Sequence, residues 1–183
     1  MTELTDDEVL AKAIAGEDEA FSILYERHVG RIYNYIFYRT GSSTEAEDLT
    51  ARVFYRALGH IQSYRNMGVP FSAWLYRIAH NLVANWHRDN SRRHEVALDD
   101  QINLVPSAEH PEATLVQNQE MEWLLQIIHK LTPERQQLLI LKFVERLSNA
   151  EIAVIMRRSE GAIKSLYHRT LLSLRGELEE QEK

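Results

Sequence analysis

Residues that favour a buried position recur at every third or fourth place over most of this chain, and this spacing constrains the fold most strongly. A helix turns once per 3.6 residues, so such residues line one face of an amphipathic helix. Only 7 Gly and 4 Pro are available for tight turns among 183 residues, and no run alternates as a half-buried strand does. The clearest stretch, between Glu17 and Gly41, contains Phe21, Leu24, Tyr25, His28, Val29, Ile32, Tyr33, Ile36 and Phe37. The sequence therefore predicts an all-α fold.

Capping residues divide the first half of the chain into four helices. Thr5 and Glu8 form a capping-box pattern before a short helix that reaches about Ala15, and Gly41 is a natural end for the long helix that follows. Thr44-x-x-Glu47 predicts the start of a third helix. Pro70, after a loop over 59–69, predicts the first turn of a fourth. The inner residues expected for the third and fourth helices are Leu49, Val53, Phe54, Ala57, Leu58, Phe71, Trp74, Leu75, Ile78, Ala79, Leu82, Val83 and Trp86.

The helical spacing stops after Arg93 and resumes near Leu115. The intervening residues contain two prolines and several acids, and no Lys or Arg occurs between residues 96 and 122. We therefore expect a flexible acidic linker over 91–114, joining a domain over 1–90 to a domain over 115–183. In the second domain Thr132 and Pro133 predict a helix start. The residues with helical spacing there include Trp123, Leu124, Ile127, Ile128, Leu138, Leu139, Leu141 and Phe143.

The segment 148–175 has the sharpest local pattern. Ser148-x-x-Glu151 opens a short helix over 149–156, a break follows at 157–159, and a second helix starts at Glu160. One side of that second helix is mainly apolar and carries Ile163, Tyr167, Thr170, Leu171 and Leu174. The other side is more polar and carries Gly161, Ser165, His168, Arg169 and Leu172. Lys164 and Arg175 lie at the boundary between the two sides. This is the layout of a helix-turn-helix, whose second helix enters a major groove, and equally that of an ordinary helical hairpin with a solvated outer face.

Aromatic and basic residues are mixed in the first domain. They are Tyr55, Tyr64, Phe71, Trp74, Tyr76 and Trp86, with Arg65, Arg77, Arg88, Arg92 and Arg93. Aromatic faces that stack unpaired bases, beside arginines that follow the backbone, are typical of single-stranded DNA binding. The alternative is that the aromatic rings are core, and helical spacing favours this for Phe71 and Trp74. Tyr64 and Arg65, in a polar loop, have less packing reason to be there.

Charge and composition exclude several classes of function. The net charge is −6, but residues 60–95 and 148–175 form two islands of +3 each, a pattern compatible with two nucleic-acid surfaces or with ordinary variation. With 0 Cys, and with histidines that lack companions at metal-ligand spacing, we expect neither a metal nor a cofactor. Nucleophile and phosphate-loop motifs are missing, so we expect no enzyme. An acidic start and the lack of an apolar run of about 18 residues favour a cytoplasmic protein without membrane insertion.

Three segments resemble bacterial RNA polymerase sigma factors, in the order in which that family has them. Ala46-Glu47-Asp48-Leu49, with Phe54, Arg56 and Ala57, resembles the helix that docks on the polymerase clamp. Residues 71–81, which read FSAWLYRIAHN, resemble the segment that melts and reads the -10 element, and residues 148–174 resemble the helix-turn-helix that reads the -35 element. The chain has no room for the extra domains of the larger members. The resemblance is therefore to the extracytoplasmic-function (ECF) group.

This resemblance implies that the chain binds core RNA polymerase, through its clamp and flap regions, and directs initiation at specific promoters. It also makes an anti-sigma factor a candidate partner. Carried over position by position, the residues for polymerase contact are Asp48, Leu49, Arg52, Phe54 and Arg56. Those for the melted -10 strand are Tyr64, Arg65, Asn66, Trp74, Arg77, Asn81, Asn85 and Arg88. Those for the -35 duplex are Arg158, Ser159, Glu160, Lys164, Ser165, His168 and Arg169.

The chain departs from the family pattern at four positions. Ala51 and Arg52 replace a Gln-acid pair on the clamp helix, Arg157 stands where the turn commonly has Gly, and Leu166 stands where many members have Arg. Arg157 must tolerate a left-handed conformation or the turn differs, and Leu166 either packs inward or touches a thymine methyl. The alternative functions are a stand-alone helix-turn-helix regulator, which would need a dimer and an effector domain, and a helical adaptor without DNA contact.

Overall fold

The computed structural model describes residues 3–66, 68–96 and 115–181, and over these ranges the chain is helical without strands. The predicted all-α class is confirmed. The helices fall into two compact units, residues 1–103 and 104–183, each with its own core. The chain thus has the two helical bodies that the spacing predicts, and the boundary between them lies within the predicted linker.

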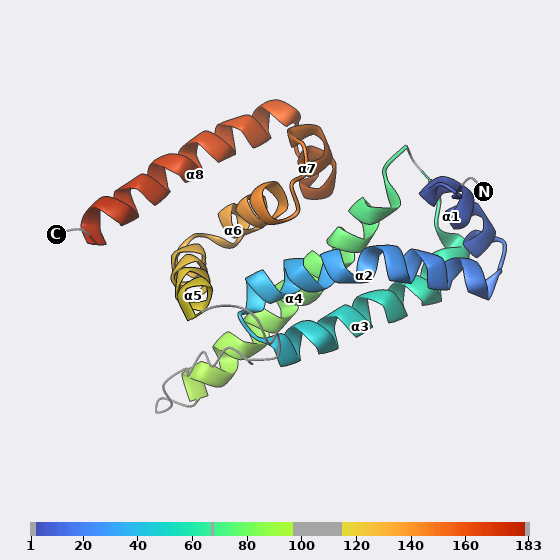
Figure 1. Cartoon of the computed structure of the whole chain (residues 1–183), viewed down its shortest axis with the longest axis horizontal. Coiled ribbons are helices and arrows are strands. Elements are labelled where there is room, and N and C mark those ends of the chain that lie inside the picture. Colours follow the sequence, from blue (N-terminus) through green and yellow to red (C-terminus); the bar gives the residue numbers. More distant parts are fainter. Residues whose placement is uncertain (1–2, 67, 97–114, 182–183) are drawn as a thin grey trace. The chain divides into compact units, whose positions relative to one another are not determined.

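The first unit consists of α1 (Asp6–Ile14), α2 (Asp18–Thr40), α3 (Ser43–His60) and α4 (Phe71–Val96), with a 3₁₀ turn at Ile61–Ser63. The three long helices pack against one another, and α1 lies across α2 at the end where the chain enters (Figure 1). Each long helix contributes one apolar face to the core, which includes Leu24, Ile32, Ile36, Leu49, Val53, Leu75, Leu82 and Val83. This packing holds α4 in place, so that its outer face is free for contacts.

Local hydrogen bonds explain where these helices begin and end. The Thr5–Glu8 capping box forms, and Gly41 ends α2 with a left-handed φ of 69°, both as predicted. The cap predicted at Thr44 is wrong, because the Ser42 hydroxyl accepts from the Glu45 amide at 3.3 Å and starts α3 earlier. Pro70 lies just outside α4, which begins at Phe71.

Two further expectations differ from the structure. Leu58 was expected on the inner side of α3 but is 49% exposed, because it lies on the outer side of the helix with Tyr55, whereas its neighbours Ala57 and Ile61 are buried. Helix α4 continues to Val96, so residues 91–96 of the predicted linker are helical. Residues 97–114 lie outside the described residues, and a flexible linker over them stays a prediction.

The second unit consists of α5 (Leu115–Lys130), α6 (Pro133–Leu139), a π-helical turn at Ile140–Val144, α7 (Asn149–Met156) and α8 (Glu160–Gln181). Pro133 occupies the first turn of α6, and the Ser148–Glu151 capping box starts α7, as predicted. Both α6 and α7 pack on α8. The core of this unit includes Ile127, Ile128, Leu138, Ile140, Leu141, Ile152, Ile163, Leu166 and Thr170.

The turn between α7 and α8 keeps the geometry that glycine would favour, with an arginine in its place. Arg157 has φ 54° and ψ 47°, in the left-handed region. Its amide donates to the Val154 carbonyl at 3.3 Å, and the Arg158 amide donates to the Ala153 carbonyl at 3.0 Å. These two bonds satisfy the last carbonyls of α7 and set the direction in which α8 leaves.

We expect Arg157→Gly to stabilise the second unit by about 0.5–1 kcal/mol. Relief of the left-handed conformation gains about 1–2 kcal/mol, and the greater freedom of unfolded glycine offsets part of this gain. Arg157→Ala is the matched control, since alanine keeps the Cβ that causes the clash and should leave stability nearly unchanged. Native-state hydrogen exchange at the buried amides of Leu166 and Thr170 measures the difference. Equal protection in both variants would contradict the expectation.

Candidate nucleic-acid interface

Helix α4 presents a row of hydrogen-bonding side chains on its outer face. Asn81, Asn85 and Arg88 are exposed, and Arg77 is half-buried one turn before them. Their spacing of three and four residues places them in line along the helix. Arg88 donates to the side-chain oxygen of Asn85, which holds the two head groups together. A row of amides and guanidinium groups can bind base edges and phosphates alike.

An aromatic cluster lies at the start of this row. The Tyr64 ring is 4.8 Å from the Trp74 ring and 6.0 Å from the Phe71 ring, measured between centroids. Phe71 is buried, as the helical spacing favours, whereas Tyr64 and Trp74 are half-buried. Tyr64 thus has a packing role that its loop position did not indicate. Burial raises the pKa of Tyr64, with Arg77 opposing and Asp7 adding to the rise, so both charges lie near this ring.

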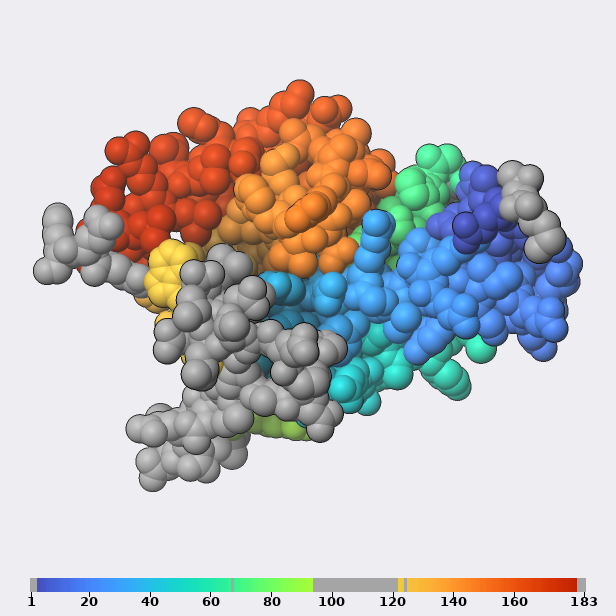
Figure 2. All heavy atoms as spheres, viewed as in Figure 1, coloured from blue at the N-terminus to red at the C-terminus, as the bar shows by residue number. Residues whose placement is uncertain are grey.

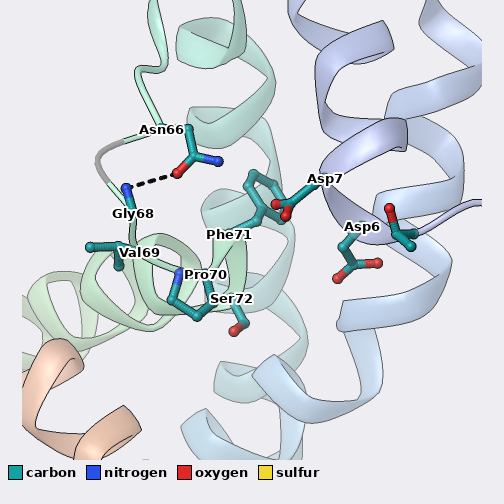
Figure 3. Close-up of a pocket in the computed structure, with 9 residues that line it drawn as sticks. Asp6, Asp7, Asn66, Gly68, Val69, Pro70, Phe71 and Ser72 are labelled. Carbon is teal, nitrogen blue, oxygen red and sulfur yellow. Dashed lines mark hydrogen bonds between the residues drawn. The ribbon is translucent and has the colours of Figure 1, made fainter.

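A hollow of about 380 Å³ opens beside the cluster (Figure 3). The first turn of α1, the loop after Tyr64 and the first turn of α4 line it. Within the loop the Asn66 side-chain oxygen accepts from the Gly68 amide at 3.0 Å, which shapes the turn, and Gly68 has a left-handed φ of 74°. The residues that line the hollow are Thr5, Asp6, Asp7, Asn66, Gly68, Val69, Pro70, Phe71 and Ser72.

A buried polar group fixes another side of α4. Arg39 is 1% exposed, and its guanidinium donates to the Tyr35 hydroxyl at 3.0 Å and to His80 Nδ1 at 3.3 Å. His80 must be neutral to accept from this cation. Burial and then the charge of Arg39 lower the pKa of His80 from 6.5 to about 4. His87 donates to the Arg39 carbonyl at 3.0 Å, so two histidines of α4 are bound to the end of α2.

We expect the first unit to lose stability as the pH falls from 6.5 to about 4. In that window the unfolded state binds a proton at His80 that the folded state excludes. His80→Asn keeps an acceptor near Nδ1 and removes the titration. The unfolding free energy of this variant should therefore fall less steeply over this window. Part of the fall should remain, because burial also lowers the pKa of His28. Urea unfolding followed across the pH range measures both slopes, and identical slopes would contradict the role of His80.

Helix α3 has a second surface, which the sequence indicated only in part. Asp48, Arg52 and Arg56 are exposed, with Arg52 at 3.9 Å from Asp48. Leu49 and Phe54 are 1% and 4% exposed, so these two expected contact residues are core residues instead. The family motif includes them because it covers the whole helix, and not only its outer face. Sequence reasoning missed two apolar side chains on this surface, Tyr55 (80% exposed) and Leu58.

Helix α8 carries the polar residues predicted on its outer side. Lys164, Ser165, His168 and Arg169 are exposed. Atoms of α8, in red, form part of the molecular surface drawn in Figure 2. Lys164 lies 3.6 Å from Glu160, and Arg169 Nε donates to the Ser165 carbonyl at 3.4 Å.

The start of α8 is fixed by its neighbours in the turn. The Ser159 hydroxyl accepts from the Ala162 amide at 3.1 Å, and Arg158 is paired with Glu134 of α6.

The structure settles the position of two leucines of α8. Leu166, for which two positions were open, is 3% exposed and packs inward, which excludes the contact with a thymine methyl. Leu171 was expected on the inner side but is 40% exposed. The inner face of α8 therefore runs through Ile163, Leu166 and Thr170, where α6 and α7 cover it.

The described helices include none long and apolar enough to cross a membrane.

Comparison with known families matches both units. Residues 24–93 match the family model for sigma-70 region 2, and residues 121–174 match that for sigma-70 region 4. The first match contains α3, the aromatic cluster and the amide row, and the second contains α7, the turn and most of α8. Both models describe regions of sigma factors, which are not enzymes.

Curated relatives and solved structures agree with these matches. The ECF RNA polymerase sigma factor BldN of Streptomyces coelicolor is 37% identical over 91% of this chain, which spans 63% of the length of BldN. The RNA polymerase sigma factor YlaC of Bacillus subtilis is 32% identical, over 83% of this chain and 88% of YlaC. CnrH, solved in complex with the cytosolic domain of CnrY, has the same fold, with a TM-score of 0.72 and 21% identity over 95% of this chain and 97% of CnrH. The chain therefore belongs to the ECF group of RNA polymerase sigma factors.

Proposed function

We propose that this chain binds core RNA polymerase and directs it to its promoters by reading two DNA elements in two different states. The first unit reads the -10 element as a melted single strand, and the second reads the -35 element as duplex. The observation that carries the proposal is the position of the amide row of α4 directly beside the half-buried Tyr64 and Trp74 rings.

The chemistry of the first unit suits unpaired bases. Melting a duplex costs unstacking and unpairing, and this cost is offset where the freed bases find stacking and hydrogen-bonding partners. Asn81 and Asn85 can each donate to and accept from a base edge. Arg65 and Arg88, both exposed, can follow the phosphates that connect those bases.

The second unit suits an intact groove. The exposed residues of α8 lie on one side of a helix whose other side is buried, and a helix of this kind fits the major groove. Arg158, Ser159 and Glu160 mark the end of α8 that would point toward the DNA. We assign base reading to Arg169 and phosphate contact to Lys164, since the planar fork of Arg matches two acceptors on guanine.

The exposed face of α3 is the surface that we assign to the polymerase clamp. Asp48, Arg52 and Arg56 supply charge, and Tyr55 and Leu58 supply apolar area. The second unit would contact the flap region. CnrH was solved with the cytosolic domain of CnrY bound, and we extend to this chain a protein partner of the anti-sigma type. The proposed site of action is the cytoplasm.

Run-off transcription with core polymerase on a library of genomic fragments tests this function. We expect the chain to produce defined start sites that core polymerase alone does not produce. We also expect the free chain to bind duplex DNA weakly, because its net charge is −6 and affinity for duplex comes mainly from neutralised phosphates. Tight, sequence-specific duplex binding by a dimer without polymerase would favour the stand-alone regulator instead. Polymerase binding without any change in promoter choice would favour an adaptor.

A further inference from the structure

Two arginines of the second unit hold a backbone conformation that favours glycine. Arg146 has φ 55° and Arg157 has φ 54°, and among the described residues they are the two non-glycine positions in the left-handed region. This conformation costs free energy for any residue with a Cβ, and residues held in it cluster at binding sites. The Leu147 amide donates to the Leu141 carbonyl at 3.0 Å and closes the turn at Arg146, as the bonds described above close the turn at Arg157.

The same two side chains are the unpaired cations of this unit. Both are exposed, and among the described residues neither guanidinium group has a hydrogen-bond or ion-pair partner. Each of the other lysines and arginines over 115–181 has such a partner. These others are Lys130, Arg135, Lys142, Arg158, Lys164, Arg169 and Arg175. The two costly backbone positions thus carry the two charges that nothing within the described part of the unit neutralises.

Arg146 and Arg157 stand at the two ends of α7. Arg146 lies two residues before the Ser148 cap, and Arg157 is the residue that ends the helix. The 8 residues of α7 rise about 12 Å, which is about the width of the major groove of B-DNA. In a helix-turn-helix the second helix enters the groove and the first crosses the DNA backbone. The ends of α7 are therefore the places from which phosphates on both sides of a groove can be reached.

Contacts with α8 fix both ends of α7. At its start, the Lys142 ammonium donates to the Asn149 side-chain oxygen at 2.8 Å and lies 4.8 Å from the centre of the Tyr167 ring of α8. At its end, the turn after Arg157 leads directly into α8. The two arginines thus extend from turns that are already ordered, so less conformational freedom is lost when they bind a partner.

A partner for two separated cations must carry repeated negative charge. The phosphates that border a groove do so, and arginine can bind a phosphate through two parallel hydrogen bonds. An acidic protein surface is the other source of such charge, but the length of α7 matches the groove that α8 is proposed to enter. Resting on the proposed function, we infer that Arg146 and Arg157 bind phosphates on the two sides of the upstream major groove and thereby position α8 in it.

The salt dependence of promoter binding tests this inference. Core polymerase with the full chain is bound to a promoter fragment that run-off transcription has identified, over a range of salt concentrations. We expect Arg146→Gly and Arg157→Gly each to lower the slope of log affinity against log salt by about 0.9, and the affinity at about 0.1 M salt by about eightfold. Base preference should be unchanged, because phosphates carry no sequence information.

Glycine is the informative replacement because it relieves the left-handed conformation at both positions. Both variants should resist unfolding by urea at least as well as the wild type, so weaker binding in them does not come from a damaged fold. Arg146→Lys and Arg157→Lys keep the charge and should keep the salt slope. Arg175→Ala is the matched control, since it removes the same charge from a part of α8 far along the chain from α7, and it should leave the slope unchanged.

Neutral linkages in the DNA locate the two contacts. A methylphosphonate, which removes one phosphate charge, replaces each linkage of the upstream element in turn, one strand at a time. With the wild-type chain we expect binding to fall at positions on both strands. Arg157→Gly should abolish the effect at a position on one strand, and Arg146→Gly should abolish it at a position on the other.

An unchanged salt slope in the glycine variants, or an equal fall in the lysine variants, would overturn the inference while the proposed function stands. Lower transcription with unchanged affinity for DNA would overturn it too, and would assign the two arginines to an acidic protein partner. If the wild-type chain fails to direct core polymerase to any promoter, the proposed function fails and this inference falls with it.

Discussion

Replacement of both Asn81 and Asn85 by alanine is expected to reduce formation of the open promoter complex by about a hundredfold, and each single replacement by about tenfold. Each asparagine is proposed to hold an unpaired base, and a well-made contact to a base edge contributes about 1–3 kcal/mol. Both side chains are exposed on α4, so their loss should not disturb the core. Binding to core polymerase should be unchanged, because the proposed polymerase surface lies on α3.

Permanganate reactivity of thymines near the start site measures this opening. Asn34→Ala, an identical change at an exposed position of α2, is the control and should open promoters normally. A pre-melted bubble should rescue the double variant only in part, since the freed bases still lack their partners. Normal opening by the double variant would remove the assignment of the amide row to the -10 strand.

The role of Tyr64 in base contact is better tested with Tyr64→Phe than with Tyr64→Ala, because the ring has a packing role in the structure. Its ring packs against Trp74 and Phe71, and its hydroxyl donates to the Val69 carbonyl at 3.5 Å. Tyr64→Ala would therefore disturb the cluster as well as any base contact. Tyr64→Phe keeps the ring, so retained opening in this variant together with loss in Tyr64→Ala would assign the effect to the ring and not to the hydroxyl.

Arg169→Ala is expected to relax base preference in the upstream element, whereas Lys164→Ala should lower transcription from all promoters alike. A guanidinium that binds guanine gives about 1–3 kcal/mol of discrimination at one base pair, so selectivity there should fall roughly five- to 150-fold. A lysine on phosphate acts as a point charge and carries no base preference. Arg175→Ala is the control on the same helix, since Arg175 pairs with Glu179 at 2.9 Å beyond the proposed contact residues.

Transcription from a library randomised across the upstream element measures both effects. Full retention of base preference in Arg169→Ala would show that α8 does not read the major groove through this residue. A change confined to the downstream element would contradict the placement of α8 altogether.

The sequence contains most of what determines the helices, because their caps and apolar spacing are local signals. The capping boxes at Thr5 and Ser148 and the left-handed Gly41 each act within a few residues, and all three form as predicted. Ser42 was missed as the cap of α3 because Ser42 and Thr44 are both chemically able to cap. Only the path of the chain after Gly41 decides between them.

The candidate sites were harder to predict, since they depend on which side of each helix is covered. Leu49 and Phe54 belong to the motif on α3, but α2 and α4 bury them, and Tyr55 and Leu58 are exposed in their place. Leu166 packs inward because α6 and α7 together cover more of α8 than a single neighbour would. Asp7 could not be connected with Asn66 from sequence, because nearly sixty residues separate them and only the packing of α1 brings them to one hollow.

The central claim is that the two elements are read in different states. Templates in which the bases of only one strand are changed, so that mismatches result, test this claim most directly. The account predicts that in the downstream element transcription follows the sequence of the non-template strand, even where the template strand cannot pair with it. In the upstream element a mismatch in either strand should lower transcription, because α8 requires an intact groove. Dependence on the template strand, or equal dependence on both strands, in the downstream element would contradict the account.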